Sequence, residues 1–561
     1  MEYGELVAVY DALADTQSTL EKRAILADCF ADVAPERLGT VLKLVRGTVF
    51  APWESGDLGV STSLAREAVA KATGIDEETI EEWWREAGDL GSAAGRAVER
   101  RTQRTLRTDP LTVDRVYETL RAVATYEGEG SQARRIDAIA GLVSDADPDE
   151  ATYVIRTVVG AMRLGVGEGI VRDALADALL DGSEAAVDAV QRAYEVTNDF
   201  AVVAETARAE GMAGLATLDV EVFRPVKPML AHKAADLASA LAELGDADGT
   251  VLLEAKYDGI RAKLHRRDDE IRVFTRRLED VTRQFPDAVT AVDDGIDADS
   301  FIVEAEVVAY DPETGLPVPF QRLSQRVKRT EDIEAMAEAV PVTLHCFDLL
   351  SLDGRSRLDD PLRERIDALE SVLDPHPERI ERAENRRTAD LDEAEAFYED
   401  VLGDGHEGLM VKNLDATYQP GARVGYQLKV KPTMEPLDLV VTRAKWSEGR
   451  KSDYLGRPYL ACRDPDGGFH EVGRMHTGFT DEQLERFTDL VEPLIQSVEG
   501  REARLRPEVV LTVEYEEIQA SPTYDSGFAL RFPRLSRIRE DLSPADADTC
   551  ERVRRLYEEQ R

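Results

Sequence analysis

The chain has 561 residues and is strongly acidic, with 111 Asp and Glu against 69 Lys and Arg and a net charge of −42. This length predicts about three to four domains. Its four cysteines form no C-x-x-C pair, which argues against a zinc site and a disulfide framework and favours a reducing compartment. No export segment follows Met1 and no run of about 18 apolar residues occurs, so we expect a cytoplasmic protein without a membrane span.

The basic residues are unevenly divided, because 13 are Lys and 56 are Arg. An acid-rich, Lys-poor composition along the whole chain is typical of halophilic proteins, since molar salt screens charge repulsion beyond about 3 Å. An acidic protein from a GC-rich genome is the alternative. The net charge does not exclude a nucleic-acid partner, because that affinity depends on local basic patches and on salt.

Changes in residue pattern predict three domains. Residues 1–221 are expected to form an all-α domain, since apolar residues recur every three or four positions, as at Val116, Leu120 and Val123. Residues 222–432 are expected to form an α+β domain, with strands at 250–256, 271–275, 301–310, 342–350, 408–412 and 426–431 and helices at 361–372 and 391–402. Residues 433–561 are expected to form a small β-barrel, with strands at 439–444, 459–463, 471–476 and 509–519 and a helix from Pro544.

Lys256 opens the run KYDGIR at residues 256–261. The Lys amine of a K-x-D-G run can attack the α-phosphate of a nucleoside triphosphate and hold the nucleotide as a phosphoramidate. Alone, such a run is more typical of a surface Lys before an Asp-Gly turn, so the residues downstream decide between the two interpretations.

Paired polar residues recur on three of the predicted strands. Because side chains alternate along a strand, Glu254 and Lys256 share one face, and so do Lys429 with Lys431 and Glu304 with Glu306. A solvated sheet face explains any one of these pairs. However, 4 of the 13 lysines fall in these strands and in residues 407–412, and that concentration favours a phosphate-binding site.

Nucleotidyl transfer requires further groups, and the chain offers candidates for each. A triphosphate needs Mg²⁺, which binds carboxylates, and Glu306 and Glu407 are the candidate ligands. The charge that develops on the phosphates needs cations, for which the candidates are Arg261, Arg276, Lys412, Lys429 and Lys431. A base can stack on the ring of Phe347, for which core packing is the alternative.

Together these motifs resemble, in order, those of the ATP-dependent DNA ligases of the archaeal and eukaryotic replicative type. Residues 256–261 resemble motif I, 274–276 the following F-S/T-R element, 304–308 the strand of the active-site acid, 347–350 motif III, 407–412 motif IV, 428–431 motif V and 530–541 motif VI. Residues 227–231 resemble the start of the adenylation domain, and 163–168 resemble a segment of the helical DNA-binding domain. The resemblance covers essentially the whole chain.

The resemblance implies an all-α DNA-binding domain, an α+β adenylation domain and a C-terminal OB-fold barrel. It implies that Lys256 is adenylated by ATP, that Glu254 reads the adenine edge and that Phe347 stacks on the ring. The implied phosphate contacts are Arg261, Arg276, Lys429 and Lys431, with Glu306 and Glu407 serving Mg²⁺ or the ribose and with Arg539 and Asp541 acting in the first step. The implied reaction seals nicked duplex DNA in replication, repair and recombination, and we expect a monomer.

Two positions depart from the family motifs. Gln427 stands where motif V usually has Trp, and Leu542 stands where motif VI usually has Lys. The second departure removes one expected contact to the leaving pyrophosphate. Loss of that Lys agrees with the scarcity of Lys along the whole chain.

A basic stripe in the helical domain is a candidate DNA contact. Arg96, Arg100 and Arg104 are spaced four residues apart, as on one helix face, and a solvated face is the alternative. Gln103 opens a segment where archaeal relatives carry a sliding-clamp motif, although Leu106 and Arg107 replace its aromatic residues.

Other classes of function remain open from the sequence. An RNA ligase or an RNA-capping guanylyltransferase shares K-x-D-G and the OB domain, but the helical N-terminal region favours the DNA ligase. A non-catalytic nick-binding protein with a decayed active site is a further alternative. The presence of Lys256, Glu306 and Glu407 argues against it, because decay would not spare all of them. An NAD-dependent ligase is disfavoured, since its four-cysteine zinc site is absent.

Overall fold

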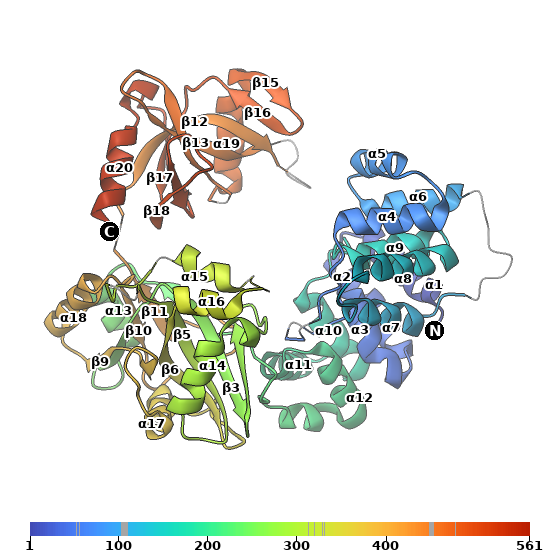
Figure 1. Cartoon of the computed structure of the whole chain (residues 1–561), viewed down its shortest axis with the longest axis horizontal. Helices are drawn as coiled ribbons and strands as arrows, with labels where there is room; N and C mark the ends of the chain where they lie inside the picture. Colours follow the sequence, from blue (N-terminus) through green and yellow to red (C-terminus); the bar gives the residue numbers. More distant parts are fainter. Residues whose placement is uncertain are drawn as a thin grey trace. The chain divides into compact units, whose positions relative to one another are not determined.

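The computed structural model describes residues 1–51, 53–54, 56–101, 110–311, 314–318, 320–327, 329, 331–432, 434–447, 454–476 and 478–560. The chain divides into two compact units, Met1–Val430 and Lys431–Arg561. Within the first unit, a helical region precedes an α+β region, and the second unit is rich in strands (Figure 1). The predicted order of all-α, α+β and strand-rich domains is confirmed. No helix in the described ranges is long and apolar enough to cross a membrane.

The N-terminal region, coloured blue to green in Figure 1, is built from helices around one apolar core. Most of these helices begin after a Ser, Thr or Asp whose side chain accepts a hydrogen bond from the first turn, as Asp89 does before α6. The helices are α1 (Tyr3–Asp15), α2 (Thr19–Asp32), α3 (Leu38–Val45), α4 (Thr62–Thr73), α5 (Glu77–Ala87), α6 (Leu90–Arg100), α7 (Val113–Ala124), α8 (Ser131–Asp145), α9 (Pro148–Val158), α10 (Glu168–Leu179), α11 (Glu184–Thr197) and α12 (Phe200–Thr217).

The α+β region contains two sheets, each with its own apolar core. The five-stranded sheet has the order β1 (His232–Lys233), β11 (Gln427–Val430), β10 (Leu409–Lys412), β2 (Val251–Ala255) and β9 (Asn385–Thr388). The six-stranded sheet has the order β4 (Glu270–Thr275), β3 (Ile260–Arg267), β5 (Ser300–Ala309), β6 (Val342–Leu352) and β7 (Arg355–Ser356), with β8 (Ile380–Arg382) paired to β6.

Helices cover both of these sheets (Figure 1). The core of the five-stranded sheet includes Leu237 and Leu241 of α13 (Leu237–Leu244) and Phe397 of α18 (Leu391–Gly403). The core of the six-stranded sheet includes residues of α14 (Pro286–Gly295), α15 (Phe320–Val327) and α17 (Leu362–Val372), and α16 (Ile333–Ala339) packs at its edge. The sequence predicted the site-bearing strands closely but did not predict β3.

The C-terminal unit is a curved seven-stranded sheet with a separate hairpin. Register shifts interrupt several of its strand pairs, and such bulges let a sheet curl toward a barrel. Its elements are β12 (Leu437–Trp446), β13 (Leu455–Arg463), β14 (Phe469–Arg474), α19 (Asp481–Val491), β15 (Ile495–Glu499), β16 (Glu502–Leu505), β17 (Val510–Glu514), β18 (Glu517–Ala520), β19 (Phe528–Arg531), β20 (Arg534–Arg539) and α20 (Cys550–Glu559).

Two predictions for this unit were wrong in detail. The strand predicted at 509–519 is two strands, β17 and β18, which belong to different sheets. The helix predicted from Pro544 begins at Cys550, because Pro544–Asp546 forms only a short 3₁₀ turn and Thr549 caps the helix proper.

A buried ion pair joins helix α17 to strand β6. Arg365 donates two hydrogen bonds to the carboxylate of Asp348, at 2.8 and 3.0 Å, and both side chains are buried. The same guanidinium also donates to the backbone carbonyls of Asp360 and Ala416. One side chain therefore fixes a helix, a strand and two loops.

Replacing this arginine tests the network. Arg365→Met should destabilise the protein by about 3–5 kcal/mol, because it leaves the Asp348 carboxylate buried without its partner. Arg355→Met is the control: its side chain is 65% exposed, so loss of its pair with Asp360 should cost less than about 1 kcal/mol. Denaturant unfolding in molar KCl measures both, and equal effects would contradict the assignment.

Candidate active site

Lys256 is held where strand β2 ends beside strand β10. Its backbone N–H donates to the carbonyl of Gly408 at 2.8 Å, and its own carbonyl accepts from the N–H of Glu407 at 2.8 Å. The Lys256 ammonium also forms an ion pair with the Glu407 carboxylate. Gly408 has a φ of +135°, which L residues with a side chain rarely adopt. The glycine therefore lets the chain turn so that Glu407 meets Lys256.

The strand register of the five-stranded sheet places further polar residues on one face. Glu254 lies opposite Met410, which lies opposite Lys429, and Lys412 lies opposite Gln427. Glu254 is buried and forms an ion pair with Lys412. Its Oε1 atom has no hydrogen-bond partner within the described residues, and the Arg382 guanidinium is 3.7 Å away. A buried acceptor without a donor suits the exocyclic amine of a base.

Gly259 brings the six-stranded sheet against this position. A Cβ atom at residue 259 would lie 2.5 Å from the Val307 carbonyl oxygen and 2.9 Å from the Glu306 Cγ atom. Any larger residue would therefore push strand β5 away. Across the β3–β5 pairing, Arg261 lies directly opposite Glu306. The Gly of K-x-D-G thus allows Glu306 to approach the Lys256 turn.

Arg261 is aimed by two acceptors. Its guanidinium donates to the Met229 carbonyl at 2.9 Å and to Glu304 at 2.7 Å. Lys263 also contacts Glu304, at 2.7 Å, and both of these side chains are buried. Burial opposes ionisation of Glu304, but Arg261 and Lys263 hold its pKa at about 2. The sequence prediction missed this support from Glu304 and Lys263, although alternation in β3 puts Lys263 beside Arg261.

Glu306 has the opposite electrostatic environment. Its pKa is raised to about 7: burial is the main cause, Glu407 and Asp258 add to the rise, and the cations of Lys256 and Arg261 oppose it. A divalent cation shared by Glu306 and Glu407 would relieve this repulsion. Among the described residues, no group of three or more His, Cys, Asp or Glu could hold a metal by itself. The residues fit Mg²⁺, which commonly takes one or two carboxylates and completes its shell with phosphate and water.

Phe347 occupies a bulge in strand β6. Glu304 pairs with Asp348 and Ala305 pairs with Cys346, so Phe347 between them has no partner on β5. Its partly exposed ring lies 4.6 Å from the Lys412 ammonium and 5.3 Å from the Arg261 guanidinium. These three residues line one small pocket, whose wall also includes Met229, Tyr418 and Gln427. The pocket therefore combines an aromatic face with two cations.

The other predicted site residues are described within their own parts of the chain. Arg276 is exposed just after strand β4. In the C-terminal unit, Lys431 is 3.9 Å from Glu516, and Arg539 pairs with Asp438 at 3.1 Å and with Asp541 at 2.7 Å. In the helical region, Arg96 and Arg100 both lie over the ring of Trp83, and Arg96 also pairs with Glu86. Gln103 and Arg104 lie outside the described residues.

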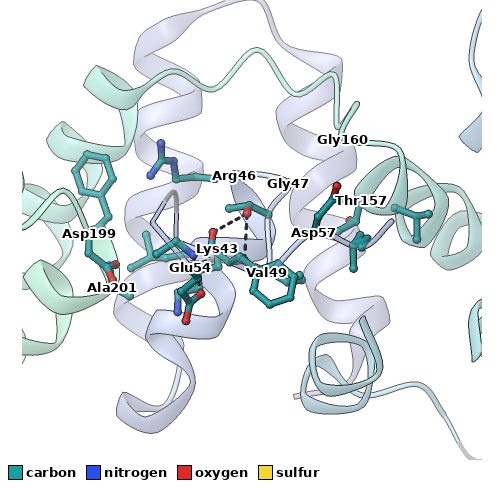
Figure 2. A pocket seen from close by; sticks show the side chains of 18 of the residues that line it. Lys43, Arg46, Gly47, Val49, Glu54, Asp57, Thr157, Gly160, Asp199 and Ala201 are labelled. Atoms are coloured by element: carbon teal, nitrogen blue, oxygen red, sulfur yellow. Dashed lines mark hydrogen bonds between the residues drawn. The ribbon is translucent and has the colours of Figure 1, made fainter. Parts of the chain in front are cut away.

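A separate cavity of about 630 Å³ lies in the helical region. Figure 2 shows that Lys43, Arg46 and Glu54 come from helix α3 and the segment after it, whereas Asp199 and Ala201 come from the start of helix α12. Thr157 and Gly160 line another part of the cavity (Figure 2). None of the predicted site residues within the described ranges lines it.

The raised pKa of Glu306 predicts a pH-dependent stability in metal-free protein. The folded-state pKa of about 7 exceeds the ordinary 4.5, so the folded protein binds the extra proton and loses stability as pH rises through this window. In Glu306→Gln, the free energy of unfolding should fall by about 1–3 kcal/mol less over this pH range than in the wild type, a figure that allows for the partial exposure of the side chain. Urea unfolding with EDTA at pH 4.5, 6 and 8 measures the slope, and identical slopes in both proteins would refute the shift.

Comparison with known proteins identifies the family. The chain matches the family models for the DNA ligase N terminus at residues 2–176, the ATP dependent DNA ligase domain at 228–431 and the ATP dependent DNA ligase C terminal region at 451–542. It is 44% identical to a DNA ligase of Thermococcus fumicolans over 99% of this chain and 98% of that protein. It is 42% identical to a DNA ligase of Natronomonas pharaonis over 99% of this chain and the whole of that protein.

A solved structure shares the fold at low sequence identity. The structure titled Pmar-Lig_PreS3 has a TM-score of 0.57 and 17% identity, covering 95% of this chain and 99% of that one. The full-length match to archaeal DNA ligases, together with the arrangement around Lys256, shows that this chain belongs to the family of ATP-dependent DNA ligases.

Proposed function

We propose that Lys256 is the nucleophile with which this ATP-dependent DNA ligase seals nicks in duplex DNA. The observation that carries the proposal is the Lys256 amine, paired with Glu407 and close to Glu306 where two sheets meet. In the first step the Lys256 Nζ attacks the α-phosphorus of ATP and pyrophosphate leaves. In the second step, an oxygen of the 5′-phosphate at the nick attacks the AMP phosphorus, and Lys256 leaves as the free amine. In the third the 3′-hydroxyl attacks that phosphate and AMP leaves.

The Lys256 amine must lose its proton before it attacks. Glu407 already accepts a hydrogen bond from the ammonium, so its carboxylate is the acceptor in contact. Glu306 and Glu407 are the residues that would hold Mg²⁺, which when bound neutralises phosphate charge and favours the neutral amine. Arg261, held in place by Glu304, supplies a fixed positive charge.

The remaining residues recognise the nucleotide. Glu254 offers its Oε1 acceptor to the adenine edge, and Phe347 offers its ring to the base. Lys412, Lys429 and Arg276 extend the set of phosphate contacts. Lys431 and Arg539 are paired with acidic residues of their own unit, so they must exchange these partners when they contact phosphate.

Three finer proposals concern the setting of the reaction. The charge of −42 and the scarcity of Lys support a halophilic origin and an enzyme that works in concentrated KCl. Membership of the DNA ligase family supports a cytoplasmic role in replication, repair and recombination. Arg96 and Arg100 are proposed to contact DNA phosphates with the faces that do not cover Trp83. Gln103 is the candidate position for binding the sliding clamp, and a pull-down with the clamp at high salt tests it.

Labelling with radioactive nucleotides tests the nucleophile. Wild-type protein incubated with ATP labelled at the α-phosphate, Mg²⁺ and molar KCl should gain one covalent label that resists alkali and is lost in acid, as a phosphoramidate is, and GTP and NAD should give none. Lys256→Ala should gain no label and should not seal nicks, since the amine at the end of β2 is then removed. Lys71→Ala, which removes an exposed lysine of helix α4, should label normally. Labelling of Lys256→Ala would move the nucleophile elsewhere, and labelling by GTP would indicate a capping enzyme.

The salt dependence of nick binding tests the basic stripe. For duplex DNA, the slope of log K against the logarithm of the salt concentration becomes steeper by about 0.9 for each phosphate that the protein neutralises. Arg96→Met and Arg100→Met should each make the slope shallower by about that amount. Arg85→Met removes an exposed arginine of the neighbouring helix α5, which is paired with Glu81, and should leave the slope unchanged. Unchanged slopes in all three variants would assign Arg96 and Arg100 to the packing of Trp83 alone.

A further inference from the structure

Tyr257, the residue after Lys256, lies in a buried cluster of rings. Its ring stacks on the imidazole of His345, with centroids 4.0 Å apart and planes 15° from parallel. The same ring meets the imidazole of His406 edge-on, with centroids 4.6 Å apart and planes at 68°. His406 directly precedes Glu407. The cluster therefore contacts the chain next to both members of the Lys256–Glu407 ion pair.

The edges of the His345 ring face two polar side chains, and one of its faces stacks on Tyr257. Its Nε2 atom lies 2.9 Å from the Tyr310 hydroxyl, and its Nδ1 atom lies 3.3 Å from a carboxylate oxygen of Glu381. Only 3% of His345 is exposed. Because strand β6 pairs with β5, His345 also lies directly opposite Glu306. The imidazole thus connects the Glu306 strand to the Lys256 turn.

The Tyr257 ring is held from its far end as well. Its hydroxyl accepts a hydrogen bond from the Glu384 N–H at 3.0 Å. The flat stack on His345 and this single bond together set the direction of the Tyr257 side chain. Since adjacent residues share a peptide plane, fixing Tyr257 also limits the orientation that Lys256 can take. The backbone bonds from Glu407 and Gly408 restrain Lys256 from the other side.

We propose that His345 is a positioning residue for adenylation: its ring is the platform that, through Tyr257, aims the Lys256 amine. This inference rests on the proposed role of Lys256 as nucleophile. The His345 ring stacks on Tyr257, the neighbour of Lys256, so the proposed effect of His345 on Lys256 is one of geometry. Small displacements of a reacting group reduce rates by up to about 100-fold without abolishing substrate binding. Loss of the platform should therefore lower the rate constant for adenylation and leave the KM for ATP nearly unchanged.

Three variants separate the ring from its polar edges. His345→Phe keeps a flat face for Tyr257 but loses the nitrogen atoms, His345→Gln keeps polar atoms but loses the ring, and His345→Ala loses both. Single-turnover adenylation should be slowest in His345→Ala, by of the order of 10–100-fold, and His345→Phe should recover more of the rate than His345→Gln. The KM for ATP should change less than about threefold in all of them.

A matched control removes a buried imidazole away from the Lys256 turn. His265 on strand β3 is fully buried, accepts a hydrogen bond from the Phe223 N–H at 2.9 Å and meets Phe274 edge-on. His265→Ala should lose stability without a selective fall in the adenylation rate constant. If it slows adenylation as much as His345→Ala does, or if His345→Phe recovers no more rate than His345→Gln, the platform is refuted.

Two further outcomes are distinguishable. If wild-type protein gains no covalent AMP, the proposed nucleophile fails, whereas normal labelling of His345→Ala refutes only the platform. If His345→Ala does not fold, Tyr257→Phe and Tyr257→Leu carry the test from the other side of the stack. The Phe variant keeps the stacked face and loses only the hydroxyl bond, so it should adenylate faster than the Leu variant, both with an unchanged KM, while equal rates in the two variants would refute the platform.

Discussion

The site depends on one junction, where the end of strand β2 is bonded to the start of strand β10. Two backbone hydrogen bonds and one ion pair join Lys256 to Glu407 and Gly408 there. The junction turns a linear order in the sequence into a cluster, since β2 also carries Glu254 and β10 also carries Lys412. Gly259 then admits the second sheet with Glu306. Without this junction, Glu306 and Glu407 would not both lie beside Lys256.

Strand β5 shows how environment divides similar residues into different roles. Glu304 and Glu306 are two residues apart on the same face, yet the pKa of one falls to about 2 and that of the other rises to about 7. At Glu304 the contacts with Arg261 and Lys263 outweigh the effect of burial, whereas at Glu306 burial prevails over Lys256 and Arg261, and two other carboxylates add to the rise. The first is thus a permanent charge that holds Arg261, and the second is a group that responds to added cations.

Much of the fold follows from local sequence patterns. Apolar alternation around residues 252, 303 and 428 was sufficient to predict β2, β5 and β11, and the motif spacing was sufficient to predict several of the residues that meet around Lys256 and Phe347. Strand β3 was not predicted, although the segment IRAKLHRR alternates well, because its charged residues suggested an exposed segment. They are buried only because Glu304 on the neighbouring strand β5, which is distant in sequence, pairs with them. Charge burial of this kind depends on pairing and leaves no mark on local composition.

Other features required the tertiary structure for the same reason. The bulge at Phe347 exists only in the register between β5 and β6, so the sequence alone could not decide between base stacking and core packing for that ring. The stripe of Arg96 and Arg100 was visible in the sequence, but its use in covering Trp83 was not. The stack of Tyr257 on His345 joins two segments far apart in the chain and has no local signature.

The burial of the Arg261–Glu304–Lys263 triad has a consequence for the way in which the site responds to salt. Mobile ions shield charges that are separated by water, over about 3 Å at 1 M, but they do not enter a packed interior. Glu304 and Lys263 are almost completely inaccessible, so the field that holds Arg261 is independent of the medium. Surface pairs such as Arg486 with Glu540 have no such shelter. The protein therefore contains two kinds of electrostatic interaction: buried ones, which salt does not alter and which set the geometry around Arg261, and exposed ones, whose strength changes with the salt concentration.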